Sequence, residues 1–220
     1  MGIKTVTLAQ VFNRMQFRQE LHDVVFHSDI YTLSKPRRLT HLVLHHCKYV
    51  SELYRMFMQE GIGGTKHDAP QRERIRRLTV DGLIICLSMA NVCNKKLGDV
   101  IDVRGLTVPD ACGLLLRRMG MMAKTIEDID HMGQTNPLGE IMESAALMAG
   151  CYVSLYALSY PEYNCFLRDM MYDNVEKRLL EGERRNIFFG KHIVEMNRRM
   201  QHYDQQEQLQ NLSMKDEHRV

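Results

Sequence analysis

Residues 125–158 read TIEDIDHMGQTNPLGEIMESAALMAGCYVSLYAL, and this stretch decides the fold class. A helical pattern with acidic residues three positions apart ends in a short loop containing glycine and proline, and a strongly apolar helical pattern follows it. Strand-like alternation of apolar and polar residues is nearly absent from the rest of the sequence. We therefore expect an all-α protein built as a helical bundle.

The same periodicity runs along most of the 220 residues, and breaks containing Gly, Pro or Asn divide it into helical segments. We expect helices at residues 7–29, 37–60, 71–95, 107–132, 138–159 and 161–200. The remaining residues, 201–220, are polar and rich in glutamine, which is typical of a solvated tail. The sequence thus predicts a single all-α domain over residues 1–200.

Two of the predicted hairpins resemble each other. In each, an amphipathic helix leads into a loop that contains glycine and ends in proline, and a more apolar helix leads out. We interpret them as a degenerate duplication, with repeat one at about 37–95, repeat two at about 107–159 and a closing helix at about 161–200.

Repeat two carries four acidic residues beside its loop. Glu127 and Asp130 stand three apart on the first helix, and Glu140 and Glu143 have the same spacing on the second. Residues three apart share a helix face, and a symmetric hairpin centred on Thr135 brings the two pairs to matching heights. Crowded carboxylates repel one another unless a cation joins them, so we predict that these four hold Mg²⁺, which prefers oxygen ligands.

The burial expected for Glu143 favours this metal site. The helix is apolar on nearly every face beyond Glu143, so we expect this carboxylate to be buried and to need a partner or a metal. The alternative is that acidic residues near a surface loop form a solvated face. In repeat one only Glu52 and Asp81 match the acidic positions, and we expect them to persist as salt-bridge partners of the abundant arginines.

The pattern Glu-x-x-Asp, short loop, Glu-x-x-Glu, then an apolar helix and the sequence DNVEKRLLEGERR, resembles the signature of the MazG-like all-α nucleoside triphosphate pyrophosphohydrolases. The resemblance covers roughly residues 37–190, with Asp130 in place of a Glu and Glu143 in place of an Asp. It implies Mg²⁺-dependent cleavage between the α- and β-phosphates of a nucleoside or deoxynucleoside triphosphate, which yields the monophosphate and pyrophosphate. A doubled chain with one eroded repeat also resembles the duplicated dUTPase-like branch of this superfamily.

This resemblance assigns roles to the residues that match. The four acidic residues would hold the metal, and Glu127 or Glu140 would position the attacking water. Basic side chains would contact the substrate phosphates, unless they form a solvated basic face. These candidates are Lys124, Lys177, Arg178, Arg184 and Arg185.

A second hypothesis has no catalysis. Because one repeat is eroded and the other departs from the motif, the chain fits an inactive member of the same fold that binds a nucleotide or a partner protein. The family usually assembles as dimers or tetramers, so the resemblance implies a homo-oligomer in either case.

Histidines form competing candidate sites. His41 and His45 share a helix face with a spacing that suits Zn²⁺, but no third ligand can be identified. Three more histidines are nearby in sequence: His22, His27 and His46. The pair His67 and Asp68 resembles the dyad of the HD phosphohydrolases, but it lies in the glycine-rich segment GIGGTKHDAP, and such a dyad needs a rigid helix.

Composition limits the partners. Lys and Arg number 29 against 27 Asp and Glu, so the net charge of +2 gives no reason to expect nucleic acid.

We find no signal peptide and no apolar stretch that approaches the roughly 18 residues of a membrane span. The six cysteines form no CxxC pair, and several lie in apolar runs, which is typical of small buried side chains. We therefore expect a cytoplasmic protein without a membrane partner.

Overall fold

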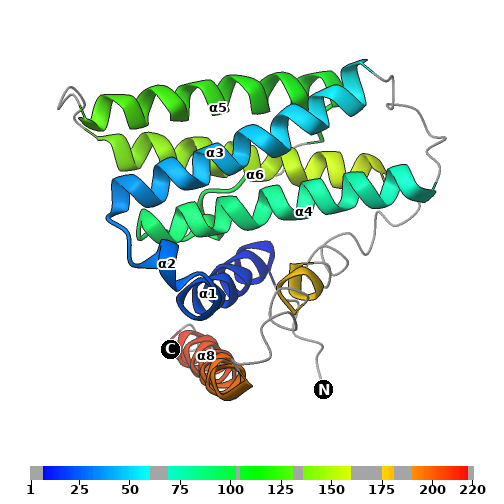
Figure 1. The fold of residues 1–220 in the computed structure, drawn as a ribbon. Coiled ribbons are helices and arrows are strands. Elements are labelled where there is room, and N and C mark those ends of the chain that lie inside the picture. Colours follow the sequence, from blue (N-terminus) through cyan, green and yellow to red (C-terminus); the bar gives the residue numbers. More distant parts are fainter. Residues whose placement is uncertain are drawn as a thin grey trace.

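The computed structural model describes residues 7–59, 69–102, 105–130, 136–159, 175–180 and 190–217 (Figure 1). Within these ranges every regular element is helical and none is a strand, which confirms the predicted all-α class. The α-helices are α1 (Leu8–Phe26), α2 (Ser28–Tyr31), α3 (Lys35–Tyr54), α4 (Ala69–Val92), α5 (Val108–Asp130), α6 (Pro137–Ser159) and α8 (Gly190–Glu217). A π-helical turn (Arg55–Gln59), a 3₁₀ turn (Leu97–Asp99) and a short helix at residues 175–180 complete the described elements.

Local capping explains where several helices begin. The Thr7 side chain accepts a hydrogen bond from the Gln10 backbone N–H and starts α1. At the start of α5, the Thr107 hydroxyl accepts from the Asp110 N–H, and before α6 the Asn136 side chain accepts from the Gly139 N–H. These interactions satisfy N–H groups that a helix leaves unpaired at its first turn. The predicted starts at residues 7, 107 and 138 are therefore close to the observed ones.

Helices α3, α4, α5 and α6 form a four-helix bundle (Figure 1). The α3–α4 and α5–α6 hairpins lie side by side, with α3 against α5 and α4 against α6. This is the arrangement that two related hairpins would make, although a common origin of the two repeats stays a prediction.

Helix α6 lies inside the bundle and is buried on most of its surface. Tyr152 and Tyr156 are fully buried there. By length and composition alone α6 is apolar enough to cross a membrane, contrary to our expectation that no stretch would be. However, 78% of its apolar window is buried inside the protein, as expected for the central helix of a bundle.

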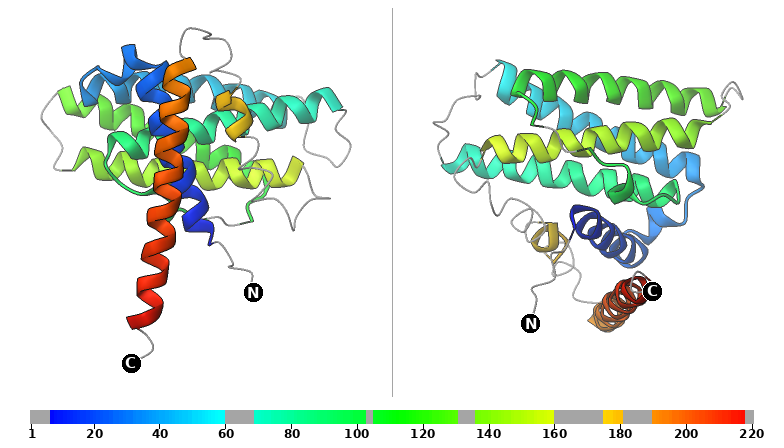
Figure 2. Two further views of the ribbon diagram at one scale, coloured as in Figure 1. Left: turned by 90° about the horizontal axis from the view of Figure 1, so that it is seen from below. Right: turned by 180° about the vertical axis from the view of Figure 1, so that it is seen from behind.

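Helices α1 and α8 lie outside the bundle, with α1 against α4 and α8 against α1 (Figure 2). The α1–α8 contact has its own apolar cluster, which contains Leu21, Met196 and Met200. In addition, Tyr203 stacks on Phe17 with ring centroids 4.6 Å apart.

The residues predicted as a polar tail continue α8 as a helix to Glu217, and most of the side chains described among residues 201–209 are exposed. Met196, Met200 and Tyr203 follow helical spacing and face α1, and Arg14 pairs with Asp204 at 2.8 Å. This amphipathic pattern extends the helix beyond its predicted end. Of the predicted closing helix, residues 161–174 and 181–189 lie outside the described residues.

Candidate functional site

The predicted acidic site lies where the α5–α6 hairpin approaches its loop. Glu127 is 60% exposed and pairs with Lys124 on its own helix at 3.3 Å. Glu140 accepts a hydrogen bond from the Thr125 hydroxyl at 3.2 Å. The side chain of Asp130 lies outside the described residues.

The rotation of α5 separates Glu127 from Glu140. Thr125 is buried and contacts Glu140, so this side of α5 faces α6. Glu127 comes two residues later, about 200° around the helix, and therefore points away from α6. A symmetric hairpin would set Glu140 opposite Asp130, but its observed contact is with Thr125, five residues earlier on α5.

Glu143 is not buried as expected. Its side chain is 64% exposed, and it accepts a hydrogen bond from Arg118 at 3.1 Å. The prediction of burial is wrong because α6 keeps a narrow solvent-facing strip at its start, where Glu140 and Glu143 both lie. Among the described side chains, Glu127, Glu140 and Glu143 form no group with ligand atoms within 4.8 Å of one another. The Mg²⁺ set with Asp130 stays a prediction.

The predicted phosphate contacts are spread over the molecule. Lys124 pairs with Glu127 and with Asp128, the latter at 2.8 Å. Lys177 is exposed on the short helix at residues 175–180. Arg184 and Arg185 lie outside the described residues.

The acidic residues of repeat one make the salt bridges that the sequence predicts. Glu52 pairs with Arg74. Asp81 accepts two hydrogen bonds from the Arg178 guanidinium, at 2.8 and 3.1 Å, and Arg77 lies 3.8 Å away. Arg178, a predicted phosphate contact, is thus held beside α4 and away from the acidic hairpin.

This Arg178–Asp81 pair lines a pocket of about 220 Å³ that also contacts α1, α2 and α3, which we call the α1–α3–α4 pocket. Its wall is rich in groups that ionise or bind protons. They are His22, Asp23, His27, Tyr31, Arg38, His41, His45, Tyr49, Asp81 and Arg178. Of the predicted acidic quartet, Glu127, Glu140 and Glu143, whose side chains the structure describes, do not belong to this wall.

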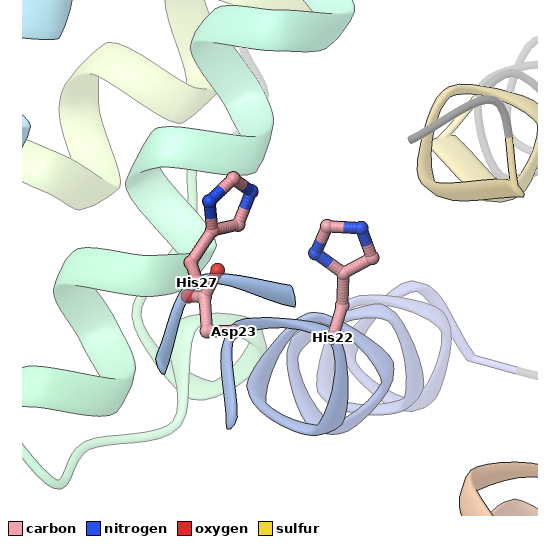
Figure 3. A group of neighbouring side chains, drawn as sticks. All are labelled: His22, Asp23 and His27. Carbon is pink, nitrogen blue, oxygen red and sulfur yellow. The ribbon is translucent and has the colours of Figure 1, made fainter. Parts of the chain in front are cut away.

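Three of these residues approach one another closely (Figure 3). One ligand atom from each of His22, Asp23 and His27 lies within 4.8 Å of the other two. The two histidines stand five residues apart. In a continuous helix, residues at that spacing lie farther from each other than residues three or four apart. They meet because α1 ends at Phe26 and His27 leaves the helical conformation, with φ −127° and ψ 38°.

Asp23 is held in place from two helices. Gln19 on α1 donates a hydrogen bond to one carboxylate oxygen and Ser88 on α4 donates to the other, both at 2.8 Å. Burial raises the pKa of Asp23, while these hydrogen bonds act in the opposite direction. The carboxylate is therefore oriented, and each oxygen keeps a lone pair for another partner.

His22 is buried, with 5% of its surface exposed, and neither ring nitrogen makes a hydrogen bond of normal geometry. Burial lowers the pKa of His22 to about 3, assisted by nearby His27 and Arg18 and opposed by the Leu179 backbone. The ring is therefore neutral near pH 7. A neutral imidazole with an unpaired nitrogen is the form that binds a metal ion or accepts a proton.

The three histidines of α3 divide into two groups. The rings of His41 and His45 lie side by side, with centroids 4.6 Å apart and planes tilted by 48°, which agrees with their predicted shared face, and both residues line the pocket. His46 is fully buried, with Nδ1 3.0 Å from the Tyr152 hydroxyl, and belongs to the core. Burial raises the pKa of Cys86, Cys93, Cys112 and Cys151, which agrees with their prediction as buried side chains.

Sequence reasoning missed Asp23 and treated His22 and His27 only as neighbours of other histidines. The available signal is the His–Asp pair at residues 22 and 23 of α1, a second pair of the kind that His67 and Asp68 form. His67 and Asp68 lie outside the described residues.

Comparison with known proteins gives no relative: no family model, curated protein or solved structure matches this chain.

Proposed function

We propose that the protein is a metal-dependent hydrolase that cleaves a phosphate ester or anhydride, and that the reaction takes place in the α1–α3–α4 pocket. The observation that carries this proposal is the convergence of four imidazoles, two carboxylates and two guanidinium groups around one space of about 220 Å³. Ionisable groups gathered in a cleft are typical of reactive sites.

The charges of the pocket suit an anionic substrate. Arg178 lines it and is oriented by Asp81, while the guanidinium carbon of Arg38 lies 4.4 Å from the Tyr31 ring centre. Guanidinium groups form paired, charge-assisted hydrogen bonds with phosphate oxygens. Arg178 is also the predicted phosphate contact that lies in this pocket.

The size of the pocket indicates how much of the substrate it holds. A volume of about 220 Å³ is smaller than the roughly 300–1,000 Å³ of sites that enclose drug-sized ligands. The pocket therefore suits a phosphate group with its metal and water, while the rest of the substrate lies at the mouth. Nucleoside triphosphates, the substrates predicted from the sequence, are the first compounds to test.

The groups beside the pocket also suit proton transfer. His45 has a buried Nδ1 without a hydrogen-bond partner, and burial together with His41 lowers the pKa of His45. A neutral imidazole in such a setting accepts a proton from attacking water. Asp23, oriented by Gln19 and Ser88, is a metal ligand in this proposal.

The pyrophosphohydrolase activity predicted from the sequence would instead take place on the acidic hairpin, with Mg²⁺ held by Glu127, Asp130, Glu140 and Glu143. The two locations are separated by measuring phosphate and pyrophosphate release from a panel of nucleoside and deoxynucleoside triphosphates, with Mg²⁺, Mn²⁺ or Zn²⁺. Asp23→Asn and Arg38→Gln change the pocket, whereas Glu127→Gln and Glu140→Gln change the acidic hairpin.

We expect each pocket variant to lose about 100-fold or more of kcat/KM, and the hairpin variants to keep near-normal turnover. Loss of turnover in the hairpin variants, with near-normal turnover in the pocket variants, would show that the active site lies on the acidic hairpin. No turnover by the unmutated protein with any of the three metals would exclude the enzyme and favour the inactive binding module. On the sequence alone we also propose a cytoplasmic homo-oligomer, a dimer or tetramer.

A further inference from the structure

We infer that His22, Asp23 and His27 form a three-ligand site for a first-row transition-metal dication of the zinc class. The site opens into the α1–α3–α4 pocket, because all three residues line it. A catalytic role of this metal site rests on the proposed function, whereas metal binding itself is inferred from the geometry of the three side chains.

The side chains are close enough to share one ion. Their ligand atoms lie within 4.8 Å of one another, and ligands around tetrahedral zinc are about 3.3 Å apart for bonds of about 2.0–2.1 Å. Small side-chain rotations close this difference. His27 is exposed and sits between α1 and α2, so its ring moves without disturbing the bundle.

His22 gives an independent indication of a ligand. Only 5% of the His22 surface is exposed, yet both ring nitrogens lack a hydrogen-bond partner of normal geometry. Buried polar groups in folded proteins nearly always have a partner. The Leu179 backbone lies near enough to act on the ring, but not with normal hydrogen-bond geometry, and a metal ion bound by one nitrogen supplies a well-placed partner.

The surroundings of Asp23 fit a supported metal ligand. Gln19 and Ser88 each donate to a different carboxylate oxygen at 2.8 Å, which fixes the orientation of the group. Hydrogen bonds of this kind orient metal ligands in known sites, and their loss weakens metal binding about 10- to 100-fold. Ser88 comes from α4, so the site joins α1 to the bundle.

The ligand types select the metal. Two imidazoles and one carboxylate suit zinc and its first-row neighbours, whereas Mg²⁺ prefers an all-oxygen shell with several waters. Three protein ligands leave at least one coordination position for water or substrate, which distinguishes a reactive zinc site from a closed structural one. The open position and the guanidinium groups of Arg38 and Arg178 share the same pocket.

The test is calorimetric titration of the metal-stripped full-length protein with Zn²⁺ and Mg²⁺, and with Co²⁺ while its visible absorption reports on coordination. We expect one Zn²⁺ per chain and no saturation by Mg²⁺ over the same concentration range. His22→Ala and His27→Ala should each weaken Zn²⁺ binding at least about 100-fold, and Ser88→Ala about 10-fold. His202→Ala removes an exposed histidine of α8 and should leave binding unchanged.

His27→Ala keeps the test decisive if His22→Ala fails to fold, because His27 is exposed. Absence of Zn²⁺ binding, or binding that survives His27→Ala unchanged, would overturn the inference. Turnover separates this result from the proposed function. Binding at the three residues without hydrolysis retains the metal site and rejects the hydrolase. Hydrolysis unaffected by His27→Ala retains the hydrolase and rejects the catalytic role of the metal site.

Discussion

His46 lies among α3, α4 and α6, with its Nδ1 3.0 Å from the Tyr152 hydroxyl and its Nε2 3.7 Å from the Cys86 sulfur. Burial lowers its pKa to about 3, the same value that burial gives His22. The fold thus lowers the pKa of two histidines to about 3, His46 in the core and His22 in the pocket wall, and it also lowers the pKa of His45.

These low pKa values predict acid sensitivity. An unfolded chain protonates histidine near pH 6.5, so below that pH the unfolded state takes up protons that the native state does not. Above about pH 6.5, these two histidines should not change the free energy of unfolding. Below it, the free energy of unfolding should fall as the pH drops toward about 3. Each histidine contributes at most about 1.4 kcal/mol per pH unit in this range.

Urea unfolding between pH 7.5 and 4.5 measures this effect. His46→Gln should show a shallower loss of unfolding free energy on acidification than the unmutated protein, because one of the two histidines is gone. His202→Gln, at an exposed position of α8, should match the unmutated slope. Equal slopes for all three proteins would show that His46 does not cause the acid sensitivity.

At the scale of helices, the close approach of α4 and α6 depends on Gly82. A Cβ atom at this position would lie 2.4 Å from the Tyr152 ring, which is itself fully buried. Gly82→Ala should lower the free energy of unfolding by about 1–3 kcal/mol, because a rigid ring must shift in a packed core.

Gly120→Ala on α5 is the matched control, since a Cβ there meets no atom within 4 Å. It should raise stability by about 0.5–1 kcal/mol, because alanine favours the helix over glycine. Urea unfolding compares the two variants directly. A Gly82→Ala protein as stable as Gly120→Ala would mean that Tyr152 has room to move.

Element positions were predictable because their signals are local. Thr7, Thr107 and Asn136 cap helices within three residues of themselves, and Pro137 opens α6. The orientation of α5 was also encoded, because its buried side carries Leu115, Met122 and Thr125 and so turns Glu127 to solvent. The spacing of acidic residues alone did not reveal this rotation.

The pocket was harder to predict because its contacts join distant positions. Arg178 reaches Asp81 across 97 residues, and Ser88 reaches Asp23 across 65. Only the break in helix geometry at His27 brings that ring toward His22, and the continuous helix predicted at 7–29 hides this break. Periodicity indicates which side of a helix is buried but not which helices meet there.

At the scale of the whole molecule, α8 is held separately from the bundle. Among the side chains of α8 that the structure describes, the buried Met196 and Met200 belong to a small cluster around Leu21, distinct from the main core. The Arg14–Asp204 ion pair and the stacking of Phe17 on Tyr203 complete this attachment. A small cluster with a partly solvent-exposed ion pair opens at a lower free energy than a large packed core.

Amide hydrogen exchange should therefore show faster exchange in α8 than in α4 and α6. Phe17→Ala should speed exchange in α8 further, because it removes the stacking partner of Tyr203, and should leave α6 nearly unchanged. Equal protection of α8 and α6 in the unmutated protein would contradict a separately held helix.

We propose that the functional centre lies in the α1–α3–α4 pocket and not on the acidic hairpin. Anomalous diffraction from crystals of the full-length protein grown with Zn²⁺ locates the ion directly. We predict the strongest anomalous peak within about 2.0–2.2 Å of ligand atoms of His22, Asp23 and His27. A peak beside Glu127, Glu140 or Glu143, with none in the pocket, would contradict the account.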